Sequence, residues 1–325
     1  MINFSSDEKM KKIVIFGGGS GLSQLLKGIK LFPLDITAVV TVADNGGSTG
    51  RLRKELNIPA VGDITKVMLS MSDMDKEIID LLNYRFTKSK TLGNHSLKNL
   101  LLNALLDLQG SFDEAIPILS KLLNIKGTVL PLTEDNVDLI GITTDDKRVY
   151  GEEMVTKSAS KIKHLEYSEE IHVNPKVFKA VSEADLIIFS SGSLLTSITP
   201  HLIDKKLVKA INEARADKMY ICNLFTQPGE TDDYTVKDHI DVLETYLGEN
   251  AIDVVIANDR VMSSKLAAKY ADEEQKDPVL LDENEFKDNI KIIKDKLFTI
   301  EDNVYRHDSL KTAYLIFSYL MDEEQ

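Results

Sequence analysis

Residues 11–21 read KKIVIFGGGSG, a short run of β-branched and apolar residues that stops at consecutive glycines. Residues 22–30 follow with apolar side chains at helical spacing, so a strand, a tight loop and a helix are predicted in succession. The pattern repeats, because residues 36–43 (ITAVVTVA) predict a second strand and residues 44–50 (DNGGSTG) a second glycine-rich loop. Repeated strand, loop and helix units predict a parallel sheet, since parallel strands need a long crossover between them.

Most of the remaining chain extends this alternation. Residues 63–123 have apolar positions at helical spacing and no strand signal, which predicts a helical layer against the sheet. A final amphipathic helix is predicted over 308–320, with Asp308 at its N-cap. After Pro175 strands return, and they are predicted at 184–190, 219–224 and 252–257.

One stretch interrupts the alternation. Residues 137–143 and 148–155 alternate apolar and polar side chains on either side of TDDK, which is a hairpin signal, and residues 162–167 add a strand. We therefore expect a small β-rich excursion over 127–172. No linker-like tract or repeat separates the halves, so the prediction is a single domain over residues 1–325, a three-layer α/β/α fold around a mostly parallel sheet.

Composition and charge exclude several classes of function. The 52 acidic residues outnumber the 39 basic ones, and the resulting net charge of -13 repels nucleic acid. The single cysteine, Cys222, excludes a disulfide framework and a zinc site built on paired cysteines, and it is expected to be buried in a strand. No run reaches the roughly 18 apolar residues of a membrane span, and the N-terminus shows no export signal, so we expect a cytoplasmic protein.

Polar and glycine-rich loops follow the predicted strands. Ligands of parallel α/β sheets bind beyond the carboxyl ends of the strands, where helix N-termini point their amides at the cleft. The concentration of small and polar residues at that edge indicates a ligand site. The loops concerned are residues 17–21, 44–50, 190–197, 223–231 and 258–259.

The first loop consists of Gly17, Gly18, Gly19, Ser20 and Gly21. Glycines let backbone amides approach a phosphate closely, and the following helix adds its dipole. The loop matches neither GxGxxG nor GxxxxGK[ST], so neither a standard NAD site nor a P-loop is indicated. The alternative is that these glycines only form a tight turn from strand to helix.

The second loop combines a carboxylate, an amide, hydroxyls and a guanidinium, which suits a hydroxyl-rich or phosphorylated ligand, or Mg²⁺ bound through the carboxylate. Its candidate ligand residues are Asp44, Asn45, Gly46, Gly47, Ser48 and Arg51. An ordinary turn is the alternative. Asp63 follows in a Gly-Asp-Ile stretch, where it is first a helix N-cap candidate and second a further metal carboxylate.

A polar stripe runs along a leucine-rich segment. Asn94 and His95 open this predicted helix, on which His95, Asn99 and Asn103 fall on one face. The stripe lines the ligand cleft or satisfies neighbouring backbone groups, and its spacing does not decide between the two.

Two later loops offer further ligand contacts. Gly192, Ser193 and Thr196 follow a predicted strand and form a second phosphate cradle. The next loop, which is too long to be only a turn, contributes candidate ligand residues Asn223, Thr226, Gln227, Gly229 and Glu230. A purely structural role for both loops is the alternative.

Five blocks, read together, resemble one known family. They are IFGGGSGLSQLLKG, VADNGGSTGRLRKEL, GNHSLKNLLLNAL, SSGSLLTSITPHL and CNLFTQPGETDDYTVKDHI. Their content and order resemble the YvcK-like gluconeogenesis factors, which belong with CofD, the 2-phospho-L-lactate transferase, over residues 11–321. The resemblance implies a Rossmann-like α/β/α core.

The resemblance also implies a function. For the gluconeogenesis factors it implies binding of UDP-sugars such as UDP-N-acetylglucosamine, with roles in cell shape and in growth on gluconeogenic carbon sources. Tyr270 and Arg306 fall where that branch carries ligand-contacting residues. Cell-wall or morphogenesis proteins are the implied partners, and we expect a homo-oligomer. For the CofD branch the resemblance implies transfer of phospholactate from a guanosine-linked donor to a deazaflavin, with Mg²⁺.

Several positions depart from the family pattern. Asn45 replaces a second aspartate, Val61 replaces a proline, Thr65-Lys66 replaces Arg-Asn, and Ser191 stands where proline usually precedes Gly-Ser. The lost carboxylate weakens the case for a metal site, so no cofactor is expected to be required. Mg²⁺ remains compatible with the sequence, and Asp44 and Asp63 are then its expected ligands.

Three hypotheses follow for the function. The leading one is a regulatory protein that binds a UDP-sugar and need not turn it over. The second is a Mg²⁺-dependent transferase that moves a phosphorus-containing group from a nucleotide donor. The third is an interaction protein whose nucleotide only stabilises a partner-binding surface.

Overall fold

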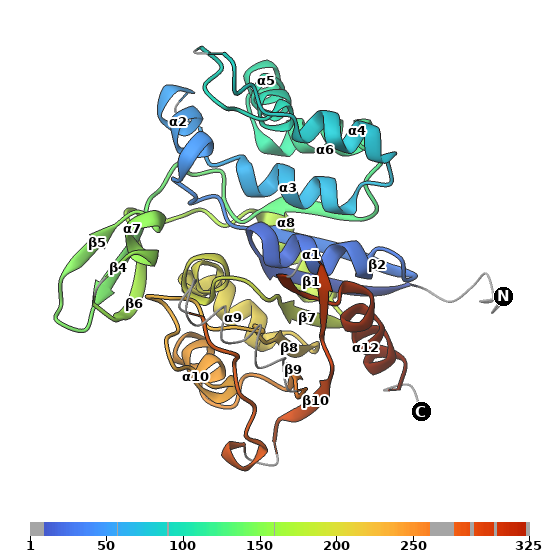
Figure 1. Ribbon diagram of the computed structural model, residues 1–325, viewed down its shortest axis with the longest axis vertical. Helices are drawn as coiled ribbons and strands as arrows, with labels where there is room; N and C mark the ends of the chain where they lie inside the picture. Colours follow the sequence, from blue (N-terminus) through green and yellow to red (C-terminus); the bar gives the residue numbers. More distant parts are fainter. Residues whose placement is uncertain are drawn as a thin grey trace.

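A seven-stranded parallel sheet lies at the centre of the chain (Figure 1), in the order β10-β9-β8-β7-β1-β2-β3. The computed structural model describes residues 10–260 and 276–322, apart from positions 57, 90, 159, 287–288 and 302–303. The predicted α/β fold with a mostly parallel sheet is confirmed. The strands are β1 (Lys11–Gly17), β2 (Leu34–Val40), β3 (Thr128–Pro131), β7 (Leu186–Phe189), β8 (Asp217–Ile221), β9 (Val254–Asn258) and β10 (Lys291–Asp295).

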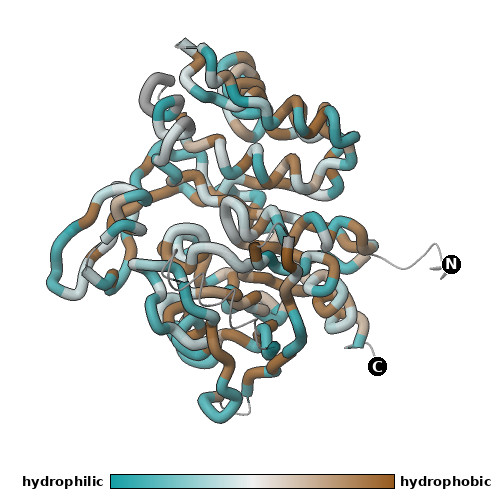
Figure 2. The backbone as a smooth tube through the Cα atoms, viewed as in Figure 1, coloured by the Kyte–Doolittle hydropathy of each residue, from teal (hydrophilic) through white to brown (hydrophobic). Residues whose placement is uncertain are grey.

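Alternate residues of each strand face opposite sides of the sheet and build two cores. In β1, Ile13 and Ile15 join one core, whereas Val14 and Phe16 join the other. None of these four side chains is more than 2% exposed, because helices cover both faces. Figure 2 shows hydrophobic segments gathered along the strands and hydrophilic ones along the outer loops. The first core packs α1 (Gly19–Ile29), α3 (Gly62–Met71) and α12 (Ser309–Asp322), and the second packs α8 (Pro175–Glu183), α9 (Lys205–Glu213) and α10 (Val236–Leu247).

The predicted helical layer is present beside α3. Thr65 on α3 donates a hydrogen bond to Asn99 on the next long helix at 2.7 Å, which joins the layer to the sheet-facing helix. Gly110 ends that helix with a φ of 85°, a conformation that glycine adopts without strain. The layer contains α4 (Lys76–Asn83), α5 (Leu97–Gln109) and α6 (Phe112–Leu122), and α2 (Gly47–Leu56) lies nearby (Figure 1).

The β-rich excursion is smaller than the segment predicted for it. β4 (Leu139–Thr143), β5 (Arg148–Tyr150) and β6 (Ile162–Tyr167) form a separate antiparallel sheet in the order β5-β4-β6. The predicted start at residue 127 is wrong, since β3 pairs with β2 in the main sheet. The predicted strand over 148–155 is also too long, because Gly151 has a φ of 88° and α7 (Glu152–Thr156) begins directly after it.

The start of α1 and three strands near the chain end differ from the prediction, whereas the predicted cap of α12 is confirmed. α1 begins at Gly19, so the loop glycines form its first turn, and the Asp308 carboxylate accepts the Lys311 N–H at 2.9 Å as the predicted cap of α12. The sequence analysis missed β10 and the antiparallel pair β11 (Phe298–Glu301) and β12 (Val304–His307). These strands are short, and in β10 charged residues flank the apolar pair, so they carry little periodic signal.

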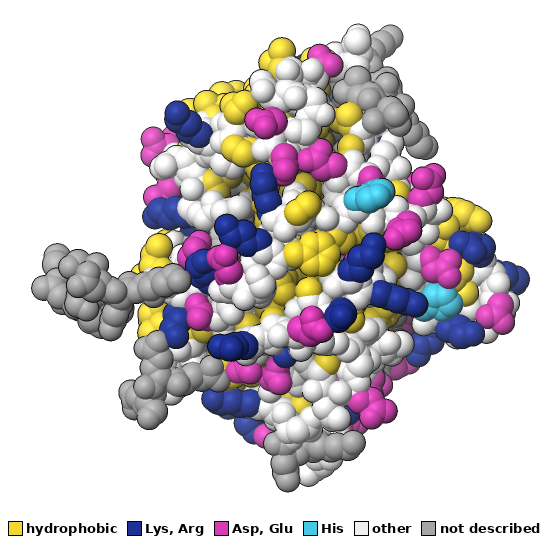
Figure 3. Space-filling model, turned by 180° about the vertical axis from the view of Figure 1, so that it is seen from behind, with side chains coloured by type: hydrophobic (Ala, Val, Ile, Leu, Met, Phe, Trp, Pro, Cys, Tyr) yellow, Lys and Arg dark blue, Asp and Glu magenta, His cyan; other side chains and the backbone are white. Residues whose placement is uncertain are grey.

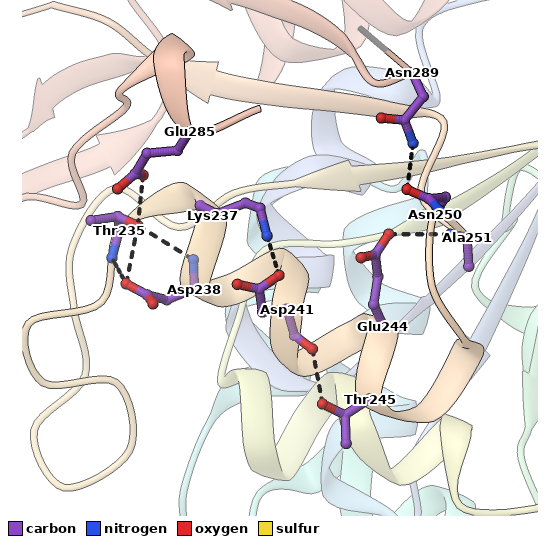
Figure 4. Close-up of polar contacts among 10 residues, drawn as sticks. All are labelled: Thr235, Lys237, Asp238, Asp241, Glu244, Thr245, Asn250, Ala251, Glu285 and Asn289. Carbon is purple, nitrogen blue, oxygen red and sulfur yellow. Dashed lines mark hydrogen bonds and ion pairs between the residues drawn. The ribbon is translucent and has the colours of Figure 1, made fainter. Parts of the chain in front are cut away.

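Helix α10 fixes the far end of the long loop after β8, as Figure 4 shows. Thr235 and Asp238 cap its start reciprocally: Thr235 Oγ1 accepts the Asp238 N–H at 3.3 Å, and Asp238 Oδ2 accepts the Thr235 N–H at 2.8 Å. Beyond its end, Glu244 accepts the Ala251 N–H at 3.1 Å. The loop is therefore held where it enters α10.

The surface bears charges of both signs. On the rear face, basic and acidic side chains are interspersed (Figure 3), so this face offers no continuous basic track for a nucleic acid. Within the described residues, no helix has the length and apolar character needed to cross a bilayer.

Candidate functional site

The first glycine loop lies at the point where the strand order of the sheet reverses. β1 and β7 are neighbours, but α1 leaves β1 on one face of the sheet and α9, which follows β7, packs on the other. Such a reversal opens a crevice beyond the carboxyl ends of the two strands. The loop after β1 and the loop after β7 meet across it.

Two glycines let these loops touch. A Cβ on Gly21 would lie 1.9 Å from the Ser191 carbonyl oxygen, and a Cβ on Gly17 would lie 2.2 Å from Ser190 Oγ. A side chain at Gly21 would force the loops apart, whereas one at Gly17 would have to displace the Ser190 hydroxyl. Part of the glycine content of the first loop thus serves the contact between loops, as well as any contact with a ligand.

A cleft of about 690 Å³, here called the polar cleft, opens beside this contact. Its walls come from the loops after β1, β7 and β8 and from the pair β11–β12. Of the predicted ligand residues, Gly18, Ser20, Gly21, Gly192, Ser193, Asn223, Thr226 and Gln227 line it. Thr156, Ser191, Ser197, Leu224, Phe225, Pro228, Lys276, Val304, Tyr305 and His307 complete the lining. None of these described lining residues is acidic, and most offer hydroxyl, amide or backbone groups.

Glu230 is buried behind the wall of the polar cleft and hydrogen-bonds to side chains that line it. It is 4% exposed and accepts hydrogen bonds from Ser193 Oγ at 2.5 Å, Gln227 Nε2 at 2.7 Å and Thr156 Oγ1 at 2.9 Å. Burial raises the pKa of its carboxyl, although these hydrogen bonds lower it. Glu230 therefore holds the lining side chains in place and is not itself part of the wall. Gly229 packs beside it, where a Cβ would lie 2.8 Å from the Thr156 carbonyl oxygen.

Asp63 holds the start of α1. The prediction that it caps α3 is wrong, because the N-cap position is Val61 and no side chain caps that end. Its carboxylate instead accepts the Gly19 N–H, and it lies against Gly19, whose φ is 53°. Burial, and then the charge of Asp44, raise the pKa of Asp63 to about 6. One backbone amide of the predicted phosphate cradle is thus occupied by the protein.

Glu152 joins Asp44 and Asp63, and the sequence analysis missed it. Burial, followed by the charge of Asp44 and a hydrogen bond shared with it, raises the pKa of Glu152 to about 8, while Thr196 hydrogen-bonds to Glu152 and lowers that pKa. The carboxyl comes from α7, which lies between β5 and β6 of the separate β-sheet. The only local signal is an acidic pair after Gly151, which reads as the start of a helix.

These carboxyls do not fit a metal centre of the kind expected for CofD. Among the residues that the structure describes, no group of three or more His, Cys, Asp or Glu side chains is arranged to hold a metal ion. Asp63 accepts the Gly19 N–H, and the side chain of Glu152 shares a hydrogen bond with Asp44. We derive no chemical step through a metal.

The loop after β2 contacts other parts of the protein more than the polar cleft. Asn45 Oδ1 accepts the Glu153 N–H at 3.1 Å, and its amide lies so close to Gly151 that a Cβ there would be 2.2 Å from Asn45 Nδ2. Asp44 Oδ1 accepts the Gly46 N–H at 2.8 Å. Arg51 donates to the Gly93 carbonyl oxygen. None of the residues Asp44, Asn45, Gly46, Gly47 and Arg51 lines the polar cleft, and the side chain of Ser48 lies outside the described part of the structure.

The residues of the predicted polar stripe lie away from the polar cleft. His95 precedes α5, whose N-cap is Ser96, so His95 does not share a helical face with Asn99. Asn99 accepts from Thr65, and Asn103 is buried with no hydrogen-bond partner among the described residues. Asn94 is exposed with a φ of 66°. None of these residues lines the polar cleft, and Asn99 joins α5 to α3.

A second cleft of about 500 Å³, here called the basic cleft, lies on the other side of the start of α1. Ser20, Gly21, Tyr305 and His307 belong to the walls of both clefts. Four cations line the basic cleft, namely Lys27, Lys66, Lys98 and Arg306. Arg306, a predicted ligand residue, is placed here by β12, whereas Tyr270 lies outside the described residues. Ser23, Gln24, Leu69, Ser70, Ile79 and Asn83 complete the lining.

Comparisons with known proteins find one family. The profile described as "2-phospho-L-lactate transferase CofD" matches residues 13–298. A protein of Bacillus subtilis (strain 168) named "Gluconeogenesis factor" is 42% identical over 313 residues, which cover 96% of this chain and 98% of that protein. A "Putative gluconeogenesis factor" of Thermotoga maritima is 41% identical and covers 94% of this chain and 98% of its own length.

Solved structures agree with these relatives. A crystal structure of a Bacillus halodurans protein superposes with a TM-score of 0.91 at 39% identity, over 95% of this chain and all of that one. A second, of a member of the upf0052 family from the same organism, superposes with a TM-score of 0.90 at 39% identity, over 94% and 99%. Fold and sequence therefore point to the same relatives.

Proposed function

This chain belongs to the gluconeogenesis factor family and carries a CofD domain, and from that premise we propose that it binds a UDP-sugar of the UDP-N-acetylglucosamine type in the polar cleft. The observation that carries the proposal is the position of this cleft at the strand-order reversal, between the glycine loop after β1 and the loop after β7. A nucleotide fits there with its phosphates near the start of α1.

The lining groups suit such a ligand chemically. The hydroxyls of Ser20 and Ser197 and the backbone around Gly192 offer neutral hydrogen-bond partners for sugar hydroxyls and a pyrimidine base. α1 has no acidic residue of its own in its first turn, so its N-terminus favours negative charge, part of which Asp63 supplies at the Gly19 N–H. Arg306 lies at the neighbouring wall and is proposed to meet the diphosphate.

We propose ligand sensing without turnover as the main role. Catalysis on a sugar nucleotide needs a nucleophile or base that is oriented by a partner. His307 is the histidine of the polar cleft, and neither of its ring nitrogens has a hydrogen-bond partner among the described residues. The cleft thus lacks a serine–histidine pair there. The cellular role proposed with it is control of cell shape and of growth on gluconeogenic carbon sources, from the cytoplasm, as a homo-oligomer acting on cell-wall or morphogenesis proteins.

A transferase of phosphorus-containing groups is the second candidate. The observation that favours it is Glu152, whose raised pKa keeps it protonated near neutral pH, and which is linked to the polar cleft through Thr196 and Ser193. A third reading, a structural nucleotide beneath a partner-binding surface, predicts that the purified protein retains its ligand through dialysis.

Thermal denaturation with UDP-N-acetylglucosamine, UDP-glucose, GDP, NAD and ATP tests the proposal. A ligand at 100 times its Kd adds about 2.7 kcal/mol of stability. We expect the UDP-sugars to raise the melting temperature, and Ser197→Leu, which fills the polar cleft beside Gly18, to abolish the rise. Ser182→Leu, on the exposed surface of α8, is the matched control. A response to GDP alone favours the transferase, and no response to any nucleotide refutes both.

A further inference from the structure

The basic cleft concentrates positive charge in a strongly acidic chain. The chain has a net charge of -13, yet Lys27, Lys66, Lys98 and Arg306 line this cleft and none of its described lining residues is acidic. Like charges gathered in one concave site repel one another, so they favour an anion that neutralises them. Asp63, outside the lining, offsets part of the charge of Lys66 and Lys98. The remaining excess of positive charge in the basic cleft points to an anionic ligand.

Three of these cations are held by neutral oxygens. Lys66 Nζ donates to Ser20 Oγ at 2.6 Å, Lys98 Nζ to Asn83 Oδ1 at 2.8 Å, and Lys27 Nζ to Gln24 Oε1 at 3.2 Å. An ammonium group has three donors, so each keeps donors for a ligand. Burial, and then the charge of Lys66, lower the pKa of Lys98 to about 8, which a bound anion would reverse.

A buried imidazole with unused hydrogen-bonding atoms borders the same space. Both ring nitrogens of His307 are shielded from solvent and have no hydrogen-bond partner among the described residues. Burial lowers the pKa of His307 to about 4, so the ring is neutral at pH 7 with one donor and one acceptor. Leaving such groups unpaired is costly. His307 lies in the walls of both clefts, but its ring nitrogens are covered by protein, so the ring forms part of the boundary between the clefts.

The basic cleft also has apolar lining residues that can contact the carbon skeleton of a ligand. Leu69, Ile79 and Tyr305 contribute apolar surface to its wall, in addition to the hydrophilic groups of Ser23 and Gln24. The volume of about 500 Å³ lies within the range of small-molecule sites. A phosphate ester with a short carbon skeleton matches this mixture better than a bare ion does.

We propose that the basic cleft is a second ligand site, which binds a small phosphate monoester next to the nucleotide of the polar cleft. Lys66 and Lys98 meet the phosphate of this second ligand, whereas Arg306 is left to the diphosphate of the nucleotide. His307, Ser20 and Gly21 lie between the two ligands, so occupancy of one site changes the affinity of the other site for its ligand. The presence of a nucleotide in the neighbouring polar cleft rests on the proposed UDP-sugar function, whereas the phosphate site itself does not.

Calorimetric titration of the full chain with glycerol 3-phosphate, without nucleotide, tests the phosphate site. The Lys66→Gln/Lys98→Gln protein is expected to bind at least about 10-fold more weakly, because two charge-assisted contacts are lost. Lys88→Gln/Lys121→Gln changes the net charge equally at two exposed positions and should bind as wild type. Lys66→Arg/Lys98→Arg keeps the charge and should keep most of the affinity, which guards against loss of folding.

Further arms of the experiment identify the ligand and its relation to the nucleotide. Glycerol 3-phosphate is expected to bind more tightly than inorganic phosphate, and glycerol not at all. Equal affinity for inorganic phosphate would mean an adventitious ion only, and equal weakening in the Lys88→Gln/Lys121→Gln control would mean general electrostatic attraction. Displacement of glycerol 3-phosphate by UDP-N-acetylglucosamine would show that the basic cleft holds the nucleotide's own phosphates and would overturn the proposal. Failure of the UDP-sugar to bind at all would leave the phosphate titration intact.

Discussion

The side-chain amide of Asn223 pairs with the backbone of Gly192 in both directions. Asn223 Oδ1 accepts the Gly192 N–H at 2.9 Å, and Asn223 Nδ2 donates to the Gly192 carbonyl oxygen at 2.8 Å. The loop after β8 thereby fixes the loop after β7, where Gly192 has a φ of 146°. Two walls of the polar cleft are joined by this one side chain.

Asn223→Asp is expected to weaken UDP-sugar binding and to destabilise the fold. The carboxylate has no donor for the Gly192 carbonyl and adds negative charge near the diphosphate, so unfolding should require roughly 1–3 kcal/mol less. Urea unfolding and titration of UDP-N-acetylglucosamine measure the two effects. Asn212→Asp, which removes a donor to the Leu247 carbonyl at 2.7 Å away from the cleft, should cost stability only. Equal affinity loss in both variants would contradict the assignment.

Gly21→Ala is expected to destabilise the protein more than Gly47→Ala. The new methyl of Gly21→Ala would lie 1.9 Å from the Ser191 carbonyl oxygen, so the loops after β1 and β7 must separate. At Gly47 nothing lies within 4 Å of an added Cβ. The free energy of unfolding should therefore fall only by the cost of holding alanine at a φ of 46°, about 1–2 kcal/mol. Urea unfolding compares the two variants, and equal stability losses would refute the close approach of the two loops.

Glu152→Gln is expected to stabilise the protein at pH 8 and to flatten its pH dependence. The pKa of Glu152 rises from 4.5 to about 8 on folding, so between those values the folded protein binds more protons than the unfolded chain. Stability therefore falls as pH rises through this window. The amide removes that loss and should gain roughly 1–3 kcal/mol at pH 8.

Urea unfolding from pH 5 to about pH 8 measures this slope. The matched control is Glu153→Gln, because Glu153 is exposed and pairs with Lys157, which lowers its pKa. The control should keep the wild-type slope in this window. An unchanged slope in Glu152→Gln would show that its carboxyl is not held against Asp44.

Arg306→Ala and Tyr270→Ala are each expected to weaken UDP-N-acetylglucosamine binding. Loss of a charge-assisted contact costs on the order of 1.5–3 kcal/mol, which is roughly 10- to 150-fold in Kd. Arg148→Ala and Tyr314→Ala remove exposed side chains of the same kinds elsewhere and serve as controls. Calorimetry on all four folded variants decides, and wild-type affinity in the first two would remove both residues from the site.

UDP-sugar binding is expected to survive EDTA. Asn45 replaces the aspartate that would join Asp44, its side chain is taken up by the Glu153 N–H, and Asp63 accepts from Gly19. Titrations in EDTA and in Mg²⁺ should therefore give the same Kd. An affinity that EDTA abolishes and Mg²⁺ restores would favour the transferase and make Asp44 and Asp63 the residues to replace.

Much of the fold could be predicted from local patterns. The β-branched runs gave β1 and β2, and the glycines after them marked the edge where ligands bind, because strand propensity and glycine's small size act within a few residues. The strands β7, β8 and β9 were located in the same way, with ends shifted by a few residues. The short strands β3, β10, β11 and β12 were missed, since runs of four or five residues carry little periodic signal and the partners of β3 and β10 lie far away in the sequence.

The sequence alone therefore determined the parallel sheet and the set of loops that follow the carboxyl ends of its strands. The tertiary structure decided which loop residues face the cleft. Asn45 turns away to the Glu153 N–H, and His307 comes beside α1, where its carbonyl accepts from Gln24 Nε2 at 3.1 Å. The residues that these two contacts join are 108 and 283 positions apart in the sequence. They depend on packing of whole elements, which no local pattern of residues encodes.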